Sequence, residues 1–229
     1  MLTRMIGVAL LAGCLAGVLA AGLQTAVLQP LILKAETYEV APIGHSAMAM
    51  PGTAVEAAAV EAMGWLSRTA ITFEATVGVA VGYALLLLAA MEGARARIDW
   101  RTGLIWGACG FAACGLAPAM GLAPALPGAA EGDLTLRQLW WIGTAISTAT
   151  GLWLALRGTP RWAAAAGAVL LLLAPHLIGA PVAAAFSSTV PAELASLFTA
   201  RSLATQSVLW LALGGLTGWF WSRGKPMAS

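Results

Sequence analysis

Charged side chains are scarce in this sequence of 229 residues: Asp, Glu, Lys and Arg make up 10% of it, while 60% is hydrophobic. A typical soluble domain carries about 25% charged residues. Too few charges remain to cover a surface that faces water on all sides. The composition therefore predicts an integral membrane protein and disfavours a soluble globular domain.

Several chemistries also lack the residues that they require. The chain has two histidines and no H-E-x-x-H sequence, and no Ser/His/Asp or Cys/His arrangement stands out. It has no glycine-rich loop followed by Lys and Ser or Thr, so we do not expect it to hydrolyse ATP. Its net charge of +2 comes without a dense basic block, which disfavours nucleic-acid binding. We therefore predict no enzyme activity and no resident cofactor.

The three cysteines, Cys14, Cys109 and Cys114, all fall within apolar runs. An odd number of cysteines in such runs disfavours a disulfide framework. Cys109 and Cys114 are five residues apart, a spacing that puts them on different faces of an α-helix and makes them a poor metal pair. We interpret all three as small packing residues.

Long apolar runs dominate what is present, and six of them approach the roughly 20 residues that a bilayer requires. They predict an all-α bundle of about six transmembrane helices in one integral membrane domain, residues 1–229. The first run contains Leu11-Ala12-Gly13-Cys14, which mimics a lipoprotein cleavage box, but apolar residues continue beyond it, as in a spanning helix. The six runs are residues 5–28, 69–91, 103–122, 136–156, 162–180 and 198–221.

The basic residues orient these spans. With both termini on one side, that side receives eight of the twelve Lys and Arg residues. Excess positive charge marks the cytoplasmic side, so we predict cytoplasmic termini. Most acidic residues fall on the outer side. The eight inner basic residues are Arg4, Arg95, Arg97, Arg101, Arg157, Arg161, Arg223 and Lys225.

The longest connection, residues 30–68, is predicted to be an outer loop with a short helix. Thr53 and Glu56 have the spacing of a capping box, in which a Thr at the N-cap and a Glu three residues later satisfy each other's backbone N–H groups. A helix that starts there can run on through Trp65 and Arg68 into the second span. The inner connections are shorter, so the polar chemistry is concentrated outside.

Pairs of glycines four residues apart occur in four of the apolar runs. Small residues allow helix backbones to approach closely in lipid. The pairs therefore suggest a compact bundle or a contact with a partner helix. They are Gly13/Gly17, Gly78/Gly82, Gly103/Gly107 and Gly214/Gly218.

Candidate metal ligands gather in the outer loop, where Glu36, Glu39 and His45 lie within ten residues of one another. Carboxylate and imidazole groups suit divalent first-row ions such as Co²⁺, Ni²⁺ or Zn²⁺. Met48 and Met50 follow, and these softer ligands favour Cu(I). A solvated loop without a metal-binding role explains the same residues.

Two further candidates lie within the apolar runs. His176 stands between Pro175 and Pro181, and a titratable group in a membrane segment is a functional candidate because its burial in lipid is costly. It is a ligand or gate for an ion, or else it lies near a helix end and has a structural role. Glu74 lies about one turn into the second span. It lines the mouth of a pathway, or it stays in the interface.

Five segments, taken in order, resemble the CbtA family, the larger membrane subunit of proposed bacterial cobalt transporters. They are 35–39 (AETYE), 126–128 (LPG), 136–141 (LRQLWW), 175–181 (PHLIGAP) and 190–194 (VPAEL). Glu36, Glu39, His176 and Glu193 occupy matching positions in these segments. The chain departs from the family pattern in two ways: its first outer loop keeps one histidine, His45, and Ala125 precedes Leu-Pro-Gly where many members have Glu. Both changes remove potential ligands.

The resemblance implies a multi-pass subunit of the bacterial inner membrane that takes up Co²⁺ for cobalamin synthesis. It also implies a partner, the small single-span CbtB subunit, which bears a histidine-containing tail. A homo-oligomer is compatible with the sequence as well. In this interpretation Glu36, Glu39, His45, Glu74 and His176 bind the transported ion. The alternative is a non-transporting scaffold that assembles or stabilises a separate permease.

Overall fold

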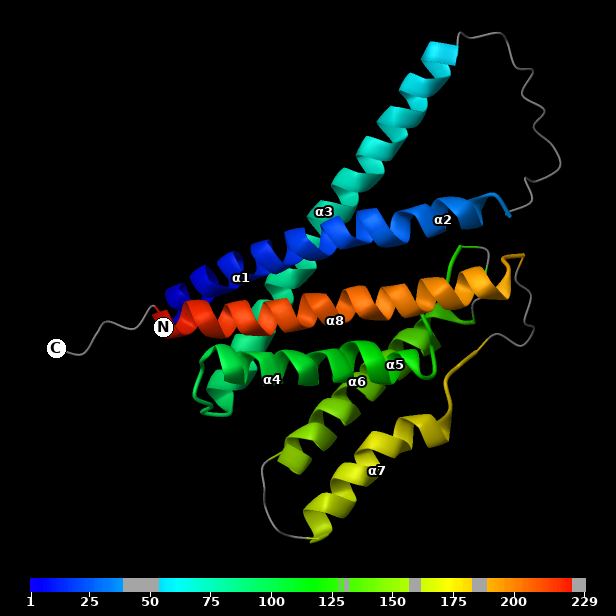
Figure 1. Cartoon of the computed structure of the whole chain (residues 1–229). Helices are drawn as coiled ribbons and strands as arrows, with labels where there is room; N and C mark the ends of the chain where they lie inside the picture. The colour runs from blue at the N-terminus through cyan, green and yellow to red at the C-terminus, as the bar shows by residue number, and fades with distance from the viewer. Residues whose placement is uncertain (39–53, 128, 130–131, 157–161, 183–188, 224–229) are drawn as a thin grey trace.

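Six continuous helices make up most of the described chain (Figure 1). The structure is a computed structural model, and it describes residues 1–38, 54–127, 129, 132–156, 162–182 and 189–223. These residues form no β-strand, so the all-α prediction is confirmed. In chain order the elements are α1 (Leu2–Leu23), η1 (Gln24–Leu28), α2 (Gln29–Glu36), α3 (Ala54–Gly93), α4 (Trp100–Phe111), η2 (Ala112–Leu116), α5 (Ala117–Ala119), α6 (Leu134–Leu156), α7 (Trp162–Ile178) and α8 (Ala192–Arg223).

Each of the six predicted apolar runs lies almost entirely within one of these helices. Four helical stretches in the described chain are long and apolar enough to cross a membrane: Leu2–Glu36, Gly64–Gly93, Trp100–Ala119 and Leu134–Leu156. The fifth run forms α7, which has 17 residues. The sixth lies in α8, which is longer, at 32 residues, but carries Glu193 and Arg201. The protein is therefore a polytopic membrane protein.

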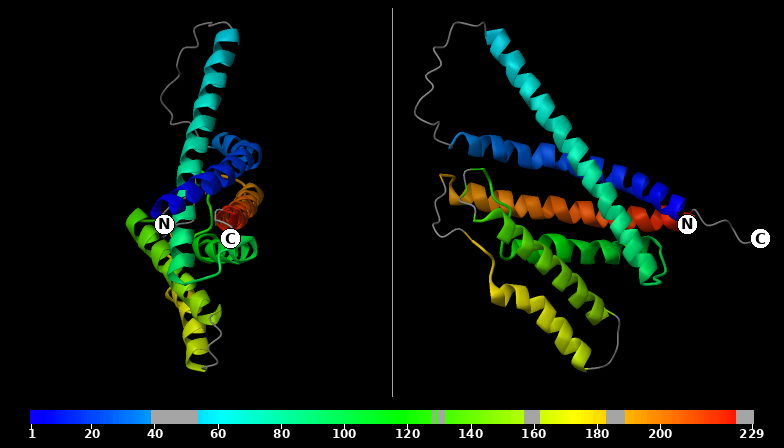
Figure 2. Two further views of the ribbon diagram at one scale, coloured as in Figure 1. Left: turned by 90° about the vertical axis from the view of Figure 1, so that its left-hand side faces the viewer. Right: turned by 180° about the vertical axis from the view of Figure 1, so that it is seen from behind.

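Successive helices run in alternating directions, so the start of α1 and the end of α8 lie at one end of the bundle (Figures 1 and 2). We call this the basic end: it holds the start of α1, the end of α3, the start of α4 and the end of α8. A guanidinium N–H of Arg4 donates to the carbonyl of Trp221 there. The opposite end holds the end of α2, the start of α6, the end of α7 and the start of α8. This arrangement matches the charge-based topology, in which both termini share a side.

Glycines allow the closest helix contacts. A Cβ on Gly103 would meet the carbonyl oxygen of Gly214, and a Cβ on Gly214 would meet that of Gly103, so α4 and α8 pack backbone against backbone. At the contact of α1 with α3, a Cβ on Gly13 would lie 2.5 Å from Cα of Val81. Gly78 and Gly82 differ, because nothing lies within 4 Å of a Cβ at either position in the described chain.

Two π-helical turns interrupt the helical ladders, η1 and η2. Each is followed by a proline in the next short helix, Pro30 in α2 and Pro118 in α5. Proline has no N–H and its ring clashes with the carbonyl four residues earlier, so the preceding turn widens. The sequence analysis placed residues 30–68 in a loop, but α2 continues the first helix to Glu36. From Ala54, next to the predicted capping box, one helix continues through Arg68 to Gly93.

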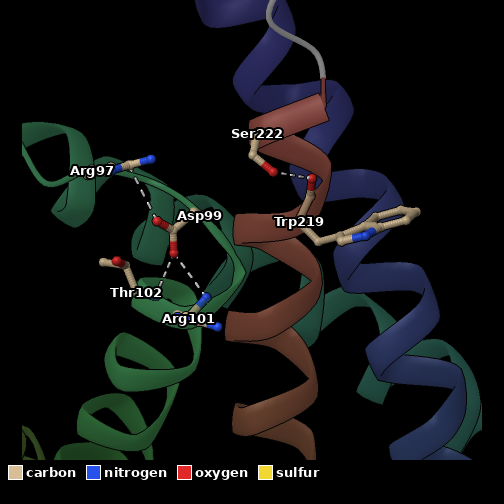
Figure 3. A network of polar contacts seen from close by, with 6 residues as sticks. All are labelled: Arg97, Asp99, Arg101, Thr102, Trp219 and Ser222. Carbon is tan, nitrogen blue, oxygen red and sulfur yellow. Dashed lines mark hydrogen bonds and ion pairs between the residues drawn. The ribbon is translucent and has the colours of Figure 1, made fainter.

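The connection between α3 and α4 has well-defined caps (Figure 3). The carboxylate of Asp99 accepts hydrogen bonds from the backbone N–H groups of Arg101 and Thr102, each at 3.0 Å, and so caps α4. These bonds, that from Thr102 foremost, lower the pKa of Asp99 from its ordinary value of 3.8. At the end of α3, the N–H of Ala96 donates to Met91 and that of Arg95 donates to Glu92, which is a Schellman motif.

Candidate functional site

Glu36 lies at the last residue of α2, beside α3. Its Oε1 atom is 2.7 Å from a guanidinium nitrogen of Arg68, and the two side chains are 35% and 57% exposed. The ion pair neutralises the carboxylate that the sequence offered as a metal ligand. Because exposed pairs contribute only about 0–1 kcal/mol, a divalent cation can displace the guanidinium at little cost.

A crevice of about 380 Å³ lies beside this ion pair, between α3 and the helix formed by α1, η1 and α2. Gln24 lines it, and Oε1 of Gln24 accepts a hydrogen bond from the hydroxyl of Thr76 on α3 at 2.9 Å. The sequence analysis did not single out these polar groups. The signal that could have found them is a polar side chain at every fourth position of one helix, 68, 72 and 76. The crevice is lined by Gln24, Thr25, Leu28, Gln29, Ile32, Leu33, Arg68, Ile71 and Thr72.

Glu74 lies on a different face of α3 from this crevice. It follows Thr72 by two residues, a rotation of about 200° around an α-helix, so the structure does not bring it to Glu36. Its side chain is exposed, and it makes no hydrogen bond or ion pair with the described residues. An isolated carboxylate on a membrane-spanning helix is costly unless water or another chain covers it.

His176 lies in the last turn of α7, where the chain leaves the helix. Its ring meets the ring of Trp140 on α6 edge-on, at 6.3 Å between centroids and 69° between planes. The indole N–H of Trp140 donates to the carbonyl of Pro175 at 3.3 Å. Gly179 then ends the helix with a φ of +87°, in the left-handed region that favours glycine.

The remaining candidates, Glu39 and His45, lie outside the described residues, as do Met48 and Met50, and they stay predictions. Within the residues that the structure describes, no group of three or more His, Cys, Asp or Glu residues is placed to hold a metal ion. Helix α7 packs against α6, on the other side of the bundle from α2 and the first part of α3 (Figures 1 and 2). His176 is therefore apart from both Glu36 and Glu74.

A larger cavity, of about 660 Å³, lies among α3, α4, α6 and α8. Cys109 and Cys114 both line it, and both are free thiols. Their spacing predicted different faces, but that expectation assumed an unbroken α-helix. The π-helical turn η2 inserts an extra residue into the helical turn between them and brings both to one side.

Residues 2–222 match the family described as probable cobalt transporter subunit (CbtA). The chain belongs to the CbtA family. No curated protein and no solved structure matches the chain.

The match to CbtA covers all six helices and both cavities. The described residues of the five segments that carried the resemblance in sequence lie at one place in the fold, the opposite end of the bundle. Ala35, Leu126, Val190 and Leu194, which come from three of these segments, pack in one buried cluster with Leu31 and Phe198. The other two segments meet through Trp140 and the carbonyl of Pro175. The five segments thus gather at one end of the molecule.

Proposed function

We propose that the chain is the membrane subunit of a Co²⁺ uptake transporter in the bacterial inner membrane. It supplies cobalt for cobalamin synthesis and catalyses no covalent reaction itself. The observation that carries the proposal is the match to the cobalt transporter subunit family over nearly the whole chain. Convergence of the five family-like segments at one end supports a shared function there, since these segments are far apart in sequence.

In this proposal the opposite end faces outward and collects the ion. Glu36, Glu39 and His45 provide carboxylate and imidazole ligands that suit Co²⁺. Arg68 holds Glu36 in place until the cation arrives, and the crevice with Gln24 and Thr76 offers oxygen atoms beyond it. A membrane potential contributes about 2.3 kcal/mol per charge per 100 mV, so roughly twice that for a divalent ion.

Glu74 and His176 complete the proposed route, and their positions imply a second chain. Glu74 is exposed on α3, so its carboxylate faces a path only if another protein covers it. His176 belongs to α7, and this helix lies on the other side of the bundle from α2 and the first part of α3. A small single-span subunit of the CbtB type, or a second copy of this chain, is the proposed cover. The partner also explains why Gly78 and Gly82, on the same helix as Glu74, meet nothing in the described chain.

Uptake of radiolabelled cobalt by cells tests this proposal. We expect Glu36→Gln and His176→Ala to reduce initial uptake at limiting cobalt by about tenfold or more, because a lost metal ligand costs at least as much as a lost outer-shell partner. Glu92→Gln, at the basic end, is the matched control and should transport normally. Membrane levels of each variant are measured alongside. Normal uptake by His176→Ala would remove that residue from the route.

A non-transporting scaffold is the second candidate. The observations that favour it are the Arg68 partner of Glu36 and the packing of His176 against Trp140, since both give these residues structural roles. A scaffold predicts that a Glu36→Gln, Glu39→Gln double variant retains full uptake, whereas a substitution at the glycine contact of α4 with α8 abolishes it. Loss of uptake by the double variant, at normal membrane levels, supports transport through this chain.

A further inference from the structure

The cavity near the basic end is apolar and has aromatic walls. Tyr83 stacks on Trp210 at 4.7 Å between ring centroids, and Trp106 packs against Trp153 at 5.8 Å. Its volume of about 660 Å³ falls in the range of sites for small organic ligands. The lining residues are Tyr83, Leu86, Leu87, Ala90, Ala94, Ala96, Ile105, Trp106, Cys109, Gly110, Ala113, Cys114, Ala149, Leu152, Trp153, Leu156 and Trp210.

This cavity reaches from the basic end into the middle of the bundle. Ala94 and Ala96, in the connection after α3, line one end, and Cys114 lines the other. From Ile105 to Cys114 the helix formed by α4 and η2 rises by about 13 Å. The depth suits a flexible hydrocarbon chain that enters at the membrane surface.

Arg95 stands between the two alanines that line the entrance, and its backbone is strained. Its φ is +54°, at the position of the Schellman motif that glycine normally occupies. For a residue with a Cβ this conformation costs about 1–2 kcal/mol. The side chain is exposed and makes no hydrogen bond or ion pair with the described residues. An arginine at a position where glycine fits better, with a guanidinium that has no partner among the described residues, points to a ligand for its charge.

Two more guanidinium groups lie in the same connection and the first turn of α4. Arg97 is 91% exposed, and its nearest carboxylate oxygen, on Asp99, is 3.6 Å away. The guanidinium of Arg101 lies over the ring of Trp100, 5.2 Å from its centroid. Aromatic side chains of this kind mark the headgroup level of a membrane. The cavity entrance is therefore cationic and lies at the height of lipid phosphates.

We propose that an anionic phospholipid binds here, with one acyl chain in the cavity and its phosphate at Arg95, Arg97 and Arg101. Charge complementarity selects an anionic headgroup over a zwitterionic one, as in other basic pockets between transmembrane helices. Size disfavours a partner helix. A helix about 10 Å wide and 30 Å long occupies more than three times the cavity volume. The lipid bridges α3, α4 and α6. Its binding does not depend on whether the protein transports cobalt.

The headgroup half of the site is tested by lipid binding to the purified full chain, measured by native mass spectrometry with phosphatidylglycerol and with phosphatidylethanolamine. We expect preferential retention of phosphatidylglycerol, and about fivefold weaker binding in Arg95→Gly. Glycine fits the backbone at this position, so that variant should melt no lower than the wild type. Arg201→Ala removes one exposed charge elsewhere and should bind like the wild type. Equal retention of both lipids, or unchanged binding by Arg95→Gly, overturns the proposal.

The part of the site that holds the acyl chain is tested by filling the cavity with a larger side chain. Ala149→Trp places an indole in it from α6, and we expect loss of phosphatidylglycerol binding by at least about fivefold. Ala155→Trp is the matched control, because Ala155 is exposed on the same helix and does not line the cavity. Inorganic phosphate at millimolar concentration should not displace the lipid. Full displacement by phosphate, or normal lipid binding by Ala149→Trp, shows that the acyl chain does not occupy the cavity.

Discussion

Asp99 fixes the residue at which α4 begins. It accepts hydrogen bonds from two backbone N–H groups that would otherwise lack partners at the helix start. We expect Asp99→Ala to lower the melting temperature in detergent by about 2–4 °C. Asp99→Asn is the control, because asparagine is an equally good N-cap and should melt close to the wild type. An unchanged melting temperature in Asp99→Ala would contradict this role.

The same carboxylate predicts how stability depends on pH. Its pKa is lower in the folded protein than its ordinary value of 3.8, so the folded state favours the ionised form. The stabilisation is fully present above pH 3.8 and is lost as the pH falls through the folded pKa. In thermal melts at descending pH, the wild type should lose this part of its stability below pH 3.8 and Asp99→Asn should not. Parallel losses in both proteins would assign the acid sensitivity to other groups.

For single residues, the sequence identified the candidate side chains, but only the structure shows which residues surround them. The scarcity of charge in apolar runs was enough to single out Glu74 and His176. Their surroundings depend on tertiary packing. Arg68 is 32 residues from Glu36 in sequence, and Trp140 is 36 residues from His176, so no local pattern relates either pair. The roles of these residues in metal transport stay predictions.

At the scale of the helices, some glycines lie in close contacts between helices and others face open space, and substitution can distinguish the two kinds. At Gly214 a side chain would collide with the backbone of α4, whereas at Gly78 it would meet open space. We expect Gly214→Val to destabilise the protein strongly, by about 1–3 kcal/mol or more, because rigid backbones must separate. Gly78→Val should leave the melting temperature of the isolated chain nearly unchanged.

Thermal unfolding of the two valine variants, purified without a partner, provides the measurement. Both substitutions replace a glycine inside a helix with valine, so the effect of valine on helix propensity cancels. Equal destabilisation would mean that the α4–α8 contact is not tight. A Gly78→Val protein that is stable alone yet fails to assemble with a co-expressed small subunit would support the partner position proposed above.

Element boundaries were predictable where hydrophobicity alone decides them. The fourth run was expected at residues 136–156, and α6 spans Leu134–Leu156. Two features followed from backbone hydrogen bonding instead and were missed. The first is the pair of π-helical turns, which depend on how the chain accommodates Pro30 and Pro118. The second is the shared cavity of Cys109 and Cys114, which the π-helical turn η2 brings to one side of the helix. The sequence left open how far α3 extends beyond its apolar residues, because a capping box marks where a helix begins but not where it ends.

On the scale of the whole molecule, the charge pattern and the fold agree on one arrangement. Six spans put both termini on one side, and the alternating helices place the start of α1 and the end of α8 at one end, where the described arginines also gather. Which helices pack together could not be read from the sequence, since α4 contacts α8 across about a hundred residues. The side of the membrane on which the basic end lies is the remaining prediction, and the uptake proposal depends on it.

Orientation can be measured by labelling with a membrane-impermeant maleimide in intact spheroplasts. In a background without Cys14, Cys109 and Cys114, Ser196→Cys and Ser222→Cys place one thiol near each end of α8, and both positions are exposed. We expect Ser196→Cys to be labelled from outside and Ser222→Cys only after the membrane is permeabilised, because five described arginines surround the latter end. Labelling of Ser222→Cys in intact spheroplasts would put Glu36 on the cytoplasmic side. The carboxylates could then no longer collect external cobalt, and the direction of transport would have to be reversed.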